Sequence, residues 1–306
     1  MGIVLTVGSI NMDVVAFCRR APSQGETVIG ERVSFYPGGK GANQAVAAAK
    51  SGADSRLIGT VGTDAFGAEM LSHLKSSSVD VQWIAQDPQA ATGVALITVE
   101  DGGSNRIVVV PGANQKVRIA AGLCAGMSGE ALVALAQLET NVDAIQAAFE
   151  QVRSAGGVTL LNPSPLREVP AGLARHTSGL ILNEIEFSQL FDLALGDRPQ
   201  TEQVIDRLKA LSSPYRILVV TLGSKGCVVR TPEGRCERVE GHAVEAVDST
   251  GAGDCFAGAL AAALASGSAL LAAVGYANAA AAISVTRFGA GTSAPTREEV
   301  HALLRG

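Results

Sequence analysis

Residues 248–254 read Asp-Ser-Thr-Gly-Ala-Gly-Asp and lead directly into an apolar segment that predicts a helix from about Cys255. Glycines allow backbone amides to turn inward, and a helix N-terminus adds partial positive charge, so such a turn can hold a phosphoryl group. Asp254 would then lie within reach of a transferring phosphorus and of the attacking hydroxyl. The residues alone leave a second interpretation equally open, in which Asp254 only caps the helix.

The segment after this turn, residues 255–286, carries no charge and is long enough to raise the question of a membrane span. Ser266-Gly267-Ser268 divides it, and Tyr276 and Asn278 add polar groups that a lipid environment disfavours. We therefore predict two Ala-rich helices that pack closely against a sheet, and no membrane partner.

Short β-rich runs alternate with helical stretches through the rest of the chain. The predicted pairs of strand and helix are 4–7 with 41–51, 55–58 with 65–75, 131–138 with 142–154, and 180–182 with 184–193. Further strands are predicted at 158–161, 216–221, 228–230 and 236–239, and a last helix at 297–304. Such alternation indicates βαβ units, and therefore an α/β fold with a central, mostly parallel sheet flanked by helices.

Two segments, 14–36 and 92–110, carry alternating strand-like residues without a helix of their own. Residues 101–105 of the second segment, Asp-Gly-Gly-Ser-Asn, are turn formers that predict a hairpin. If the two segments meet in space, they form a small β lid. The main α/β domain is then discontinuous, and it consists of residues 1–13, 37–91 and 111–306.

Charge and cysteine content exclude several classes of function. The net charge of −5 and the scattered 24 Lys and Arg residues argue against a nucleic-acid partner. Five cysteines without a CxxC pair indicate neither a disulfide framework nor a zinc site, and favour a reducing, cytoplasmic setting. The apolar N-terminus lacks a basic leader and is interrupted by Asp13, so it is predicted to be a first strand rather than a secretory signal.

A second glycine-rich turn occurs at residues 38–45, Gly-Gly-Lys-Gly-Ala-Asn-Gln-Ala. Gly38 and Gly39 allow a tight turn, and the helix that follows presents Asn43 from its first turn, where an amide can meet a sugar hydroxyl. Taken alone, the pattern favours an ordinary glycine turn into an amphipathic helix, because a Gly-rich turn before a helix is common.

In this order, the two motifs resemble the two signatures of the PfkB carbohydrate kinases. The likeness runs from Val7 to Arg297 and is greatest to the members that phosphorylate D-ribose. It implies a ribokinase-like fold with a small β-sheet lid, and ATP-dependent transfer of a phosphoryl group to O5 of D-ribose. Asp254 is the implied general base. The implied anion-binding turn around it consists of Gly251, Ala252 and Gly253.

The resemblance also implies a sugar-binding set. Its members are Asn11, Asp13, Gly39, Lys40, Asn43, Glu139 and Asp254. A polyol needs several convergent donors and acceptors, and carboxylates that accept two hydroxyls discriminate well against analogues that lack one. Taken singly, each of Asp13 and Glu139 is interpreted more simply as a polar residue solvated at the end of a strand.

For the nucleotide, the resemblance implies an ATP-binding set and a magnesium contact. The ATP-binding residues are Asn183, Thr221, Gly223, Ser224, Gly226, Gly253 and Asn278. Glu186, in the pattern Asn-Glu-Ile-Glu at 183–186, is implied to act on Mg²⁺ through water, as Mg²⁺ prefers. The alternative for Glu186 is an ordinary solvated helix acid.

A potassium site and a homodimer complete what the resemblance implies. The potassium site consists of Asp248, Thr250, Ser284, Arg287, Gly289 and Ser293, mostly through backbone carbonyls. The alternative is a loop held by an ion pair between Asp248 and Arg287. The homodimer would form through the lid, because exposed β edges invite pairing.

Three other functions remain as alternatives. Another sugar, deoxyribose or a nucleoside could be the acceptor. The chain could be a catalytically silent sugar-binding protein, although the intact Asp254 and glycine turn argue against it. A dinucleotide oxidoreductase is disfavoured, because no GxGxxG follows the first strand. No GxxxxGK[ST] P-loop is present either, so an ATP site in this chain would be of a different kind.

Overall fold

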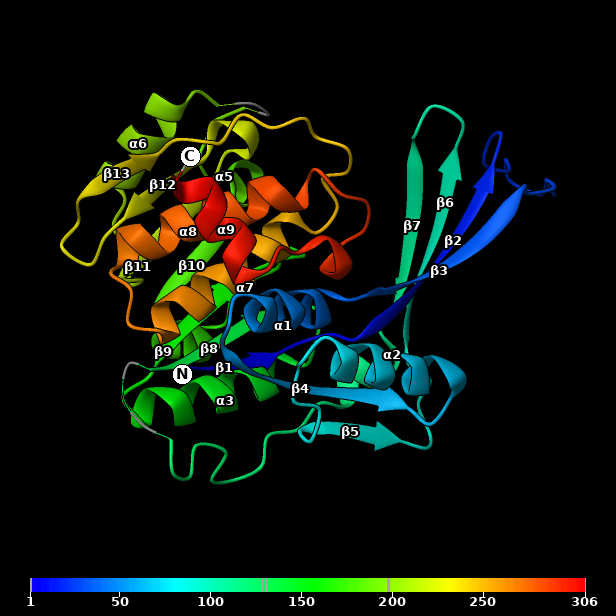
Figure 1. The fold of residues 1–306 in the computed structure, drawn as a ribbon, viewed down its shortest axis with the longest axis horizontal. Coiled ribbons are helices and arrows are strands. Elements are labelled where there is room, and N and C mark those ends of the chain that lie inside the picture. Colours follow the sequence, from blue (N-terminus) through cyan, green and yellow to red (C-terminus); the bar gives the residue numbers. More distant parts are fainter. Residues whose placement is uncertain (1, 128, 130, 197–198, 306) are drawn as a thin grey trace.

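The computed structural model describes residues 2–127, 129, 131–196 and 199–305, and within them two sheets are formed (Figure 1). The main sheet has nine strands in the order β13-β12-β11-β10-β9-β8-β1-β4-β5. Its strands are β1 (Ile3–Val7), β4 (Asp54–Gly62), β5 (Ile84–Asp87), β8 (Leu132–Gln137), β9 (Val158–Asn162), β10 (Gly179–Asn183), β11 (Ile217–Thr221), β12 (Cys227–Arg230) and β13 (Cys236–Val239). Only β12 runs against its neighbours, so the predicted α/β class with a mostly parallel sheet is confirmed.

Helices cover both faces of the main sheet, and this requires apolar strands. All six residues of β8 are buried, for example. One face packs on α1 (Lys40–Lys50), α7 (Ala252–Ala265), α8 (Leu270–Ser284) and α9 (Arg297–Arg305). The other packs on α3 (Val142–Ser154), α4 (Ala171–His176), α5 (Glu184–Leu190) and α6 (Thr201–Ala210).

The two Ala-rich helices α7 and α8 confirm the division of residues 255–286. Small side chains let α7 approach α1 closely. A Cβ atom added at Gly258 would lie 2.3 Å from the carbonyl oxygen of Gln44 and 2.7 Å from Cβ of Ala47, so only glycine fits there. None of the helices in the described part of the chain is both long and apolar enough to cross a membrane.

The second sheet is a four-stranded lid that projects from the main body beside α2 (Ala65–Ser76) (Figure 1). Its order is β3-β2-β6-β7, with β2 (Asn11–Cys18), β3 (Arg32–Gly38), β6 (Gly93–Glu100) and β7 (Asn105–Val110). β6 and β7 form the predicted antiparallel hairpin, and β2 pairs in parallel with β6. The lid strands extend beyond the predicted segment 14–36, to Asn11 and Gly38.

Among the strands and α-helices of the described residues, three were not predicted from the sequence. β5 is half exposed and has no apolar run, α4 is only six residues long, and α6 is mostly polar. α5 ends at Leu190 rather than at 193, because Asp192 adopts a left-handed backbone conformation with φ of 51°.

Candidate active site

The polar ends of the main sheet's parallel strands lie at one edge. In the register of the sheet, Gln137 at the end of β8 pairs with Asn162 of β9, and Asn183 at the end of β10 pairs with Thr221 of β11. Ligands of open α/β sheets bind beyond the carboxyl ends of the strands. Both glycine-rich motifs lie close to this edge, because side chains of residues 38–45 and of α7 hydrogen-bond to one another and to β9 there.

Asp254 lies in the first turn of α7, with a carboxylate that does not cap the helix. The N-cap position is occupied by Gly251, and no side-chain cap bond is formed. The carboxylate, 6% exposed, instead accepts hydrogen bonds from Asn43 Nδ2 (3.1 Å to Oδ2) and Gln44 Nε2 (2.9 Å to Oδ1). The interpretation of Asp254 as a simple cap is therefore wrong.

The turn before α7 has the geometry of an anion-binding site. Gly251 has a φ of 74°, and a Cβ atom there would lie 2.7 Å from Cα of Ala290, so glycine is required. The Ala252 N–H donates to Ser249 O at 3.2 Å and is thus engaged. Gly253 is exposed with open space around it, and its N–H belongs to the first helical turn, where amides lack intrahelical acceptors. A phosphoryl oxygen can approach this amide.

The turn at Gly38 and Gly39 brings α1 against the base of the lid. A Cβ atom at Gly39, whose φ is 88°, would lie 2.8 Å from the backbone N of Asn11. Asn43, from the first turn of α1, uses both ends of its amide within the protein. Its Nδ2 donates to Asp254, and its Oδ1 accepts from the Gly291 N–H at 3.1 Å.

The acidic residues of the predicted sugar set converge on the same region. A Cβ atom at Gly38 would lie 2.4 Å from the carboxyl atoms of Asp13, which shows how closely this turn covers that side chain. Burial, followed by the charges of Glu139 and Asp254, raises the pKa of Asp13 to about 6. Glu139 accepts hydrogen bonds from the Ser9 hydroxyl and from the backbone N–H of Lys40.

Lys40 supplies the positive charge among these acids. The negative charge of Asp254, and then those of Glu139 and Glu186, raises the pKa of Lys40, although burial opposes this. The ammonium group therefore stays protonated at neutral pH. It lies within electrostatic reach of the predicted base, sugar contact and magnesium contact together.

Several residues of the site were missed by sequence reasoning. Asn114, buried after the lid, donates from Nδ2 to Oδ1 of Asn11 at 2.7 Å and accepts from the Ile10 N–H at 2.9 Å. No sequence pattern marks Asn114. Gln44, by contrast, lies inside the quoted motif 38–45, and Gln137 lies near the end of the predicted strand 131–138, so their amide side chains were the available signal.

The predicted ATP loop follows β11. Gly223, Ser224 and Lys225 form a short 3₁₀ turn after Thr221, and Ser224 is exposed. Gly226 has a φ of 87°, and a Cβ atom there would lie 2.1 Å from Val239 O, so the loop requires glycine. Thr221 and Asn183 are register partners, so the loop adjoins the start of α5.

Asn183 and Glu186 form a capping box at the start of α5. Asn183 Oδ1 accepts from the Glu186 N–H at 2.7 Å, and Glu186 Oε2 accepts from the Asn183 N–H at 3.0 Å. The half-buried Glu186 is thus more than a solvated helix acid, and its Oε1 remains available for a water or a hydrated cation.

Asn278, the predicted adenine contact, has a structural partner. Its Nδ2 donates to Glu240 O at 2.6 Å, so the amide joins α8 to the loop after β13. Its side chain is buried. A direct contact with the nucleotide base stays a prediction.

The predicted potassium loops are joined by Asp248. Its Oδ1 accepts from the Thr250 N–H at 2.9 Å, and its Oδ2 accepts from the Gly289 N–H at 3.0 Å. Burial opposes ionisation of Asp248, but these hydrogen bonds outweigh it and lower its pKa. Arg287 pairs with Glu299, so the alternative of an ion pair between Asp248 and Arg287 is wrong.

Two further members of the potassium set use their side chains within the protein. The hydroxyls of Ser284 and Ser293 donate to the carbonyls of Ala281 and Ala290. Within the described residues, no group of three or more His, Cys, Asp or Glu side chains could hold a metal ion. A potassium ion at these loops would have to be held by backbone carbonyls, and the site stays a prediction.

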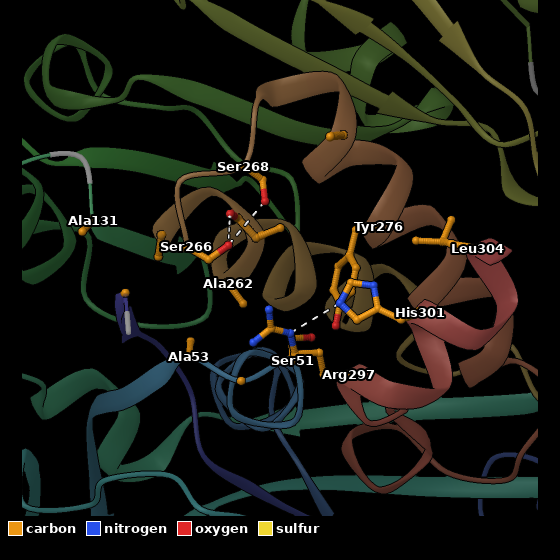
Figure 2. A pocket seen from close by; sticks show the side chains of 15 residues that line it. Ser51, Ala53, Ala131, Ala262, Ser266, Ser268, Tyr276, Arg297, His301 and Leu304 are labelled. Atoms are coloured by element: carbon orange, nitrogen blue, oxygen red, sulfur yellow. Dashed lines mark hydrogen bonds between the residues drawn. The ribbon is translucent and has the colours of Figure 1, made fainter.

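A cavity of about 700 Å³ lies near the opposite end of the main sheet (Figure 2). It is lined by residues such as Gly2 before β1, Ser51 after α1 and Ser266 after α7. The hydroxyl of Tyr276, beside Arg297 and His301 in Figure 2, lines it as well. None of the predicted site residues lines this cavity, so the candidate active site is the polar edge described above.

Known proteins resemble this chain over its whole length. The family described as pfkB family carbohydrate kinase matches residues 1–297. A ribokinase of Schizosaccharomyces pombe is 37% identical over 309 residues, covering 97% of this chain and 96% of the relative. A deoxyribokinase of Salmonella typhi is 30% identical over 312 residues, covering 98% of each. The solved structure of Arabidopsis thaliana ribokinase complexed with ribose and ATP has a TM-score of 0.90 at 28% identity, covering 100% of this chain and 99% of that one.

Proposed function

The chain belongs to the pfkB family of carbohydrate kinases, and from this premise we propose that it transfers the γ-phosphoryl group of ATP to O5 of D-ribose. The observation that carries the proposal is the buried Asp254 carboxylate, held by two amides beside an open helix N-terminus. A base and an anion-binding turn in this relation are what transfer to an alcohol requires. The likeness to ribokinases supports ribose as the acceptor.

Asp254 accepts the proton of the 5-hydroxyl as that hydroxyl attacks the γ-phosphorus. The N–H groups at the start of α7, above all that of Gly253, and the ammonium of Lys40 stabilise the charge on the transferring group. The N–H groups are fixed by the helix before the substrate arrives, so they need little reorganisation during the reaction. Closure of the lid over the sugar excludes water and limits hydrolysis of ATP.

The sugar is held between the lid and the main domain. Asp13 and Glu139 accept its hydroxyls, and Asn11, fixed by Asn114, adds an amide. In this proposal the sugar bridges the lid and the discontinuous main domain, because Asp13 belongs to a lid strand and Glu139 follows β8 of the main sheet.

The nucleotide and the cations complete the site. Thr221, Gly223, Ser224 and Gly226 form the ATP loop, with Asn183 and Asn278 flanking it. Glu186 would hold Mg²⁺ through water with the oxygen that its cap leaves free, and Mg²⁺ neutralises phosphate charge when bound. Carbonyls of the two loops joined by Asp248 would hold K⁺.

Two copies of the chain associate through the lid. Strand register places Phe35, Val14, Leu96 and Val108 in one row across the lid sheet, on the face opposite to Asp13. Phe35, Leu96 and Val108 are each about half exposed, at 52%, 49% and 61%. A row of exposed apolar side chains on a sheet is typical of a protein interface.

The five cysteines are free, which fits the cytoplasm as the setting.

An acceptor panel tests the proposal. Release of ADP is measured with Mg-ATP and K⁺ for ribose, 2-deoxyribose, fructose, adenosine and pseudouridine, and kcat/KM is compared. We expect ribose to exceed deoxyribose by at least about 10-fold, because a site that binds a hydroxyl rejects analogues without it. Preference for deoxyribose or a nucleoside would keep the kinase and overturn the acceptor. Absence of turnover with every acceptor would favour a sugar-binding protein.

A further inference from the structure

Gln44 lies at the centre of a hydrogen-bond network that the proposed chemistry does not use. Its Nε2 donates to Asp254 Oδ1 at 2.9 Å and to Asn162 Oδ1 at 3.3 Å. Its Oε1 accepts from Gln137 Nε2 at 2.6 Å. One side chain of α1 therefore joins the carboxylate at the start of α7 to the ends of strands β8 and β9.

The surroundings of Gln44 exclude contact with a substrate. The residue is 0% exposed, and so is Gln137 behind it. On the far side, a Cβ atom at Gly8 would lie 2.3 Å from Gln137 Oε1, so the second amide is held tightly against β1. Gln44 can affect the reaction only through Asp254.

The network also fixes which way the Gln44 amide points. Turning the amide over would place its oxygen against the carboxylate of Asp254, and its NH₂ group against the Nε2 donor of Gln137. The contact with Gln137 could be relieved if that amide turned as well, because Gln137 Oε1 is buried without a hydrogen-bond partner among the described residues. The contacts with Asp254 and with Asn162 Oδ1, whose Nδ2 donates to Ile181 O, would both pair two acceptors. These two neighbours therefore fix the orientation in which Gln44 donates to Asp254.

We propose that Gln44 is a positioning residue for Asp254, which orients the carboxylate toward the acceptor hydroxyl by tying it to the carboxyl edge of the main sheet. Asn43 holds the other oxygen, but it also accepts a hydrogen bond from the loop at Gly291. Gln44 is the partner whose remaining contacts lie in the rigid sheet. The inference rests on the proposed function, because it concerns the base of that reaction.

The decisive variants are Gln44→Met and Gln44→Glu. Met keeps the length of the side chain and removes the donor, so kcat should fall about 10- to 100-fold, the usual effect of losing a hydrogen bond to a charged group. KM for ribose and for ATP should change less than about 3-fold, because Gln44 touches neither. Glu places a second carboxylate beside Asp254, so the acid limb of the kcat–pH profile should move to higher pH.

The control is Val46→Ala, which shortens a buried side chain two residues further along α1. Val46 packs in an apolar cluster that does not include Gln44 or its hydrogen-bond partners. The control variant should lower the melting temperature without a shift in the pH profile. If Gln44→Met does not fold, Gln137→Met removes only the support behind Gln44, and kcat should fall by a smaller factor at unchanged KM. Changes in melting temperature alone, with kcat and the pH profile as in wild type, would overturn the inference. Failure of the wild-type chain to phosphorylate any acceptor would instead overturn the proposed function.

Discussion

The main sheet and the lid sheet are built from similar apolar strands but differ in what covers them. Every residue of β8 in the main sheet is buried between helices, and the carboxylate at its edge, Asp254, already has partners for both oxygens. Every residue of β7 in the lid is exposed. The difference supports the proposal that the main sheet carries a preorganised reaction centre, and that the lid forms contacts with the sugar and with a second copy of the chain.

The largest effect is expected at the main sheet. Asp254→Asn should lower kcat by about 10²- to 10⁴-fold, the usual contribution of a general base. The fold should persist, because Asn keeps the size and shape of Asp and still accepts one of the two hydrogen bonds, although its NH₂ group then faces the other donor, Asn43 Nδ2 or Gln44 Nε2. Steady-state kinetics with ribose and circular dichroism check this, with Asp206→Asn on the exposed side of α6 as the matched control.

Turnover of Asp254→Asn near that of wild type would show that another group is the base. Loss of turnover in Asp206→Asn would show that the assay reports stability rather than chemistry.

The next effect is expected where the lid meets the main domain. Asp13→Asn replaces an acceptor of two hydroxyls by an amide, so KM for ribose should rise about 10- to 100-fold while kcat changes less. Kinetics at saturating ATP measure both constants. A loss in kcat equal to that of Asp254→Asn would break the distinction between a lid that binds and a sheet that reacts.

Asp13 should also make stability depend on pH. Its folded pKa of about 6 exceeds the ordinary 3.8, so the folded protein holds this proton more tightly than the unfolded chain does. Ionisation of the buried Asp13 carboxyl therefore lowers the stability of the folded protein. This loss of stability is absent below pH 3.8 and complete above about pH 6. Asp13→Asn should raise the melting temperature more at pH 8 than at pH 5, and an equal change at both would contradict the raised pKa.

The ionisation of Asp13 should also appear in the pH dependence of sugar binding. Ribose hydroxyls donate to the ionised Asp13, so kcat/KM for ribose should decrease as pH falls through about 6. The decrease should be absent in Asp13→Asn. A limb that survives in this variant belongs to a different group.

The smallest effect on chemistry is expected at the outer face of the lid. Leu96→Lys together with Val108→Lys places charges in the exposed apolar row, and light scattering should then show the mass of one chain instead of two. kcat should stay within about 3-fold of wild type if the reaction centre is independent of the lid contact. A wild-type mass of one chain would remove the proposed dimer.

The same contrast explains how much could be predicted from the sequence. Buried parallel strands are apolar runs in the sequence, so β8 and β11 were predicted. The two glycine-rich turns likewise indicated where the backbone passes close to other parts of the chain, as it does at Gly39 and Gly251.

β5 was missed because it is half exposed and has no apolar run. α6 was missed although Thr201, Val204 and Leu208 recur at helical spacing on its buried face, a pattern that the sequence offered. The hydrogen bond between Gln44 and Asp254 joins residues 210 positions apart, and no local pattern encodes it.

The most direct test of the proposed reaction is the position of the phosphoryl group in the product. Wild-type protein is incubated with Mg-ATP, K⁺ and ribose labelled with ¹³C at C5, and the ¹³C spectrum is followed. The proposed reaction predicts that the C5 signal moves and splits through coupling to ³¹P as ADP forms. ADP formation with an unsplit C5 signal, whether from hydrolysis or from transfer to another hydroxyl, would contradict it.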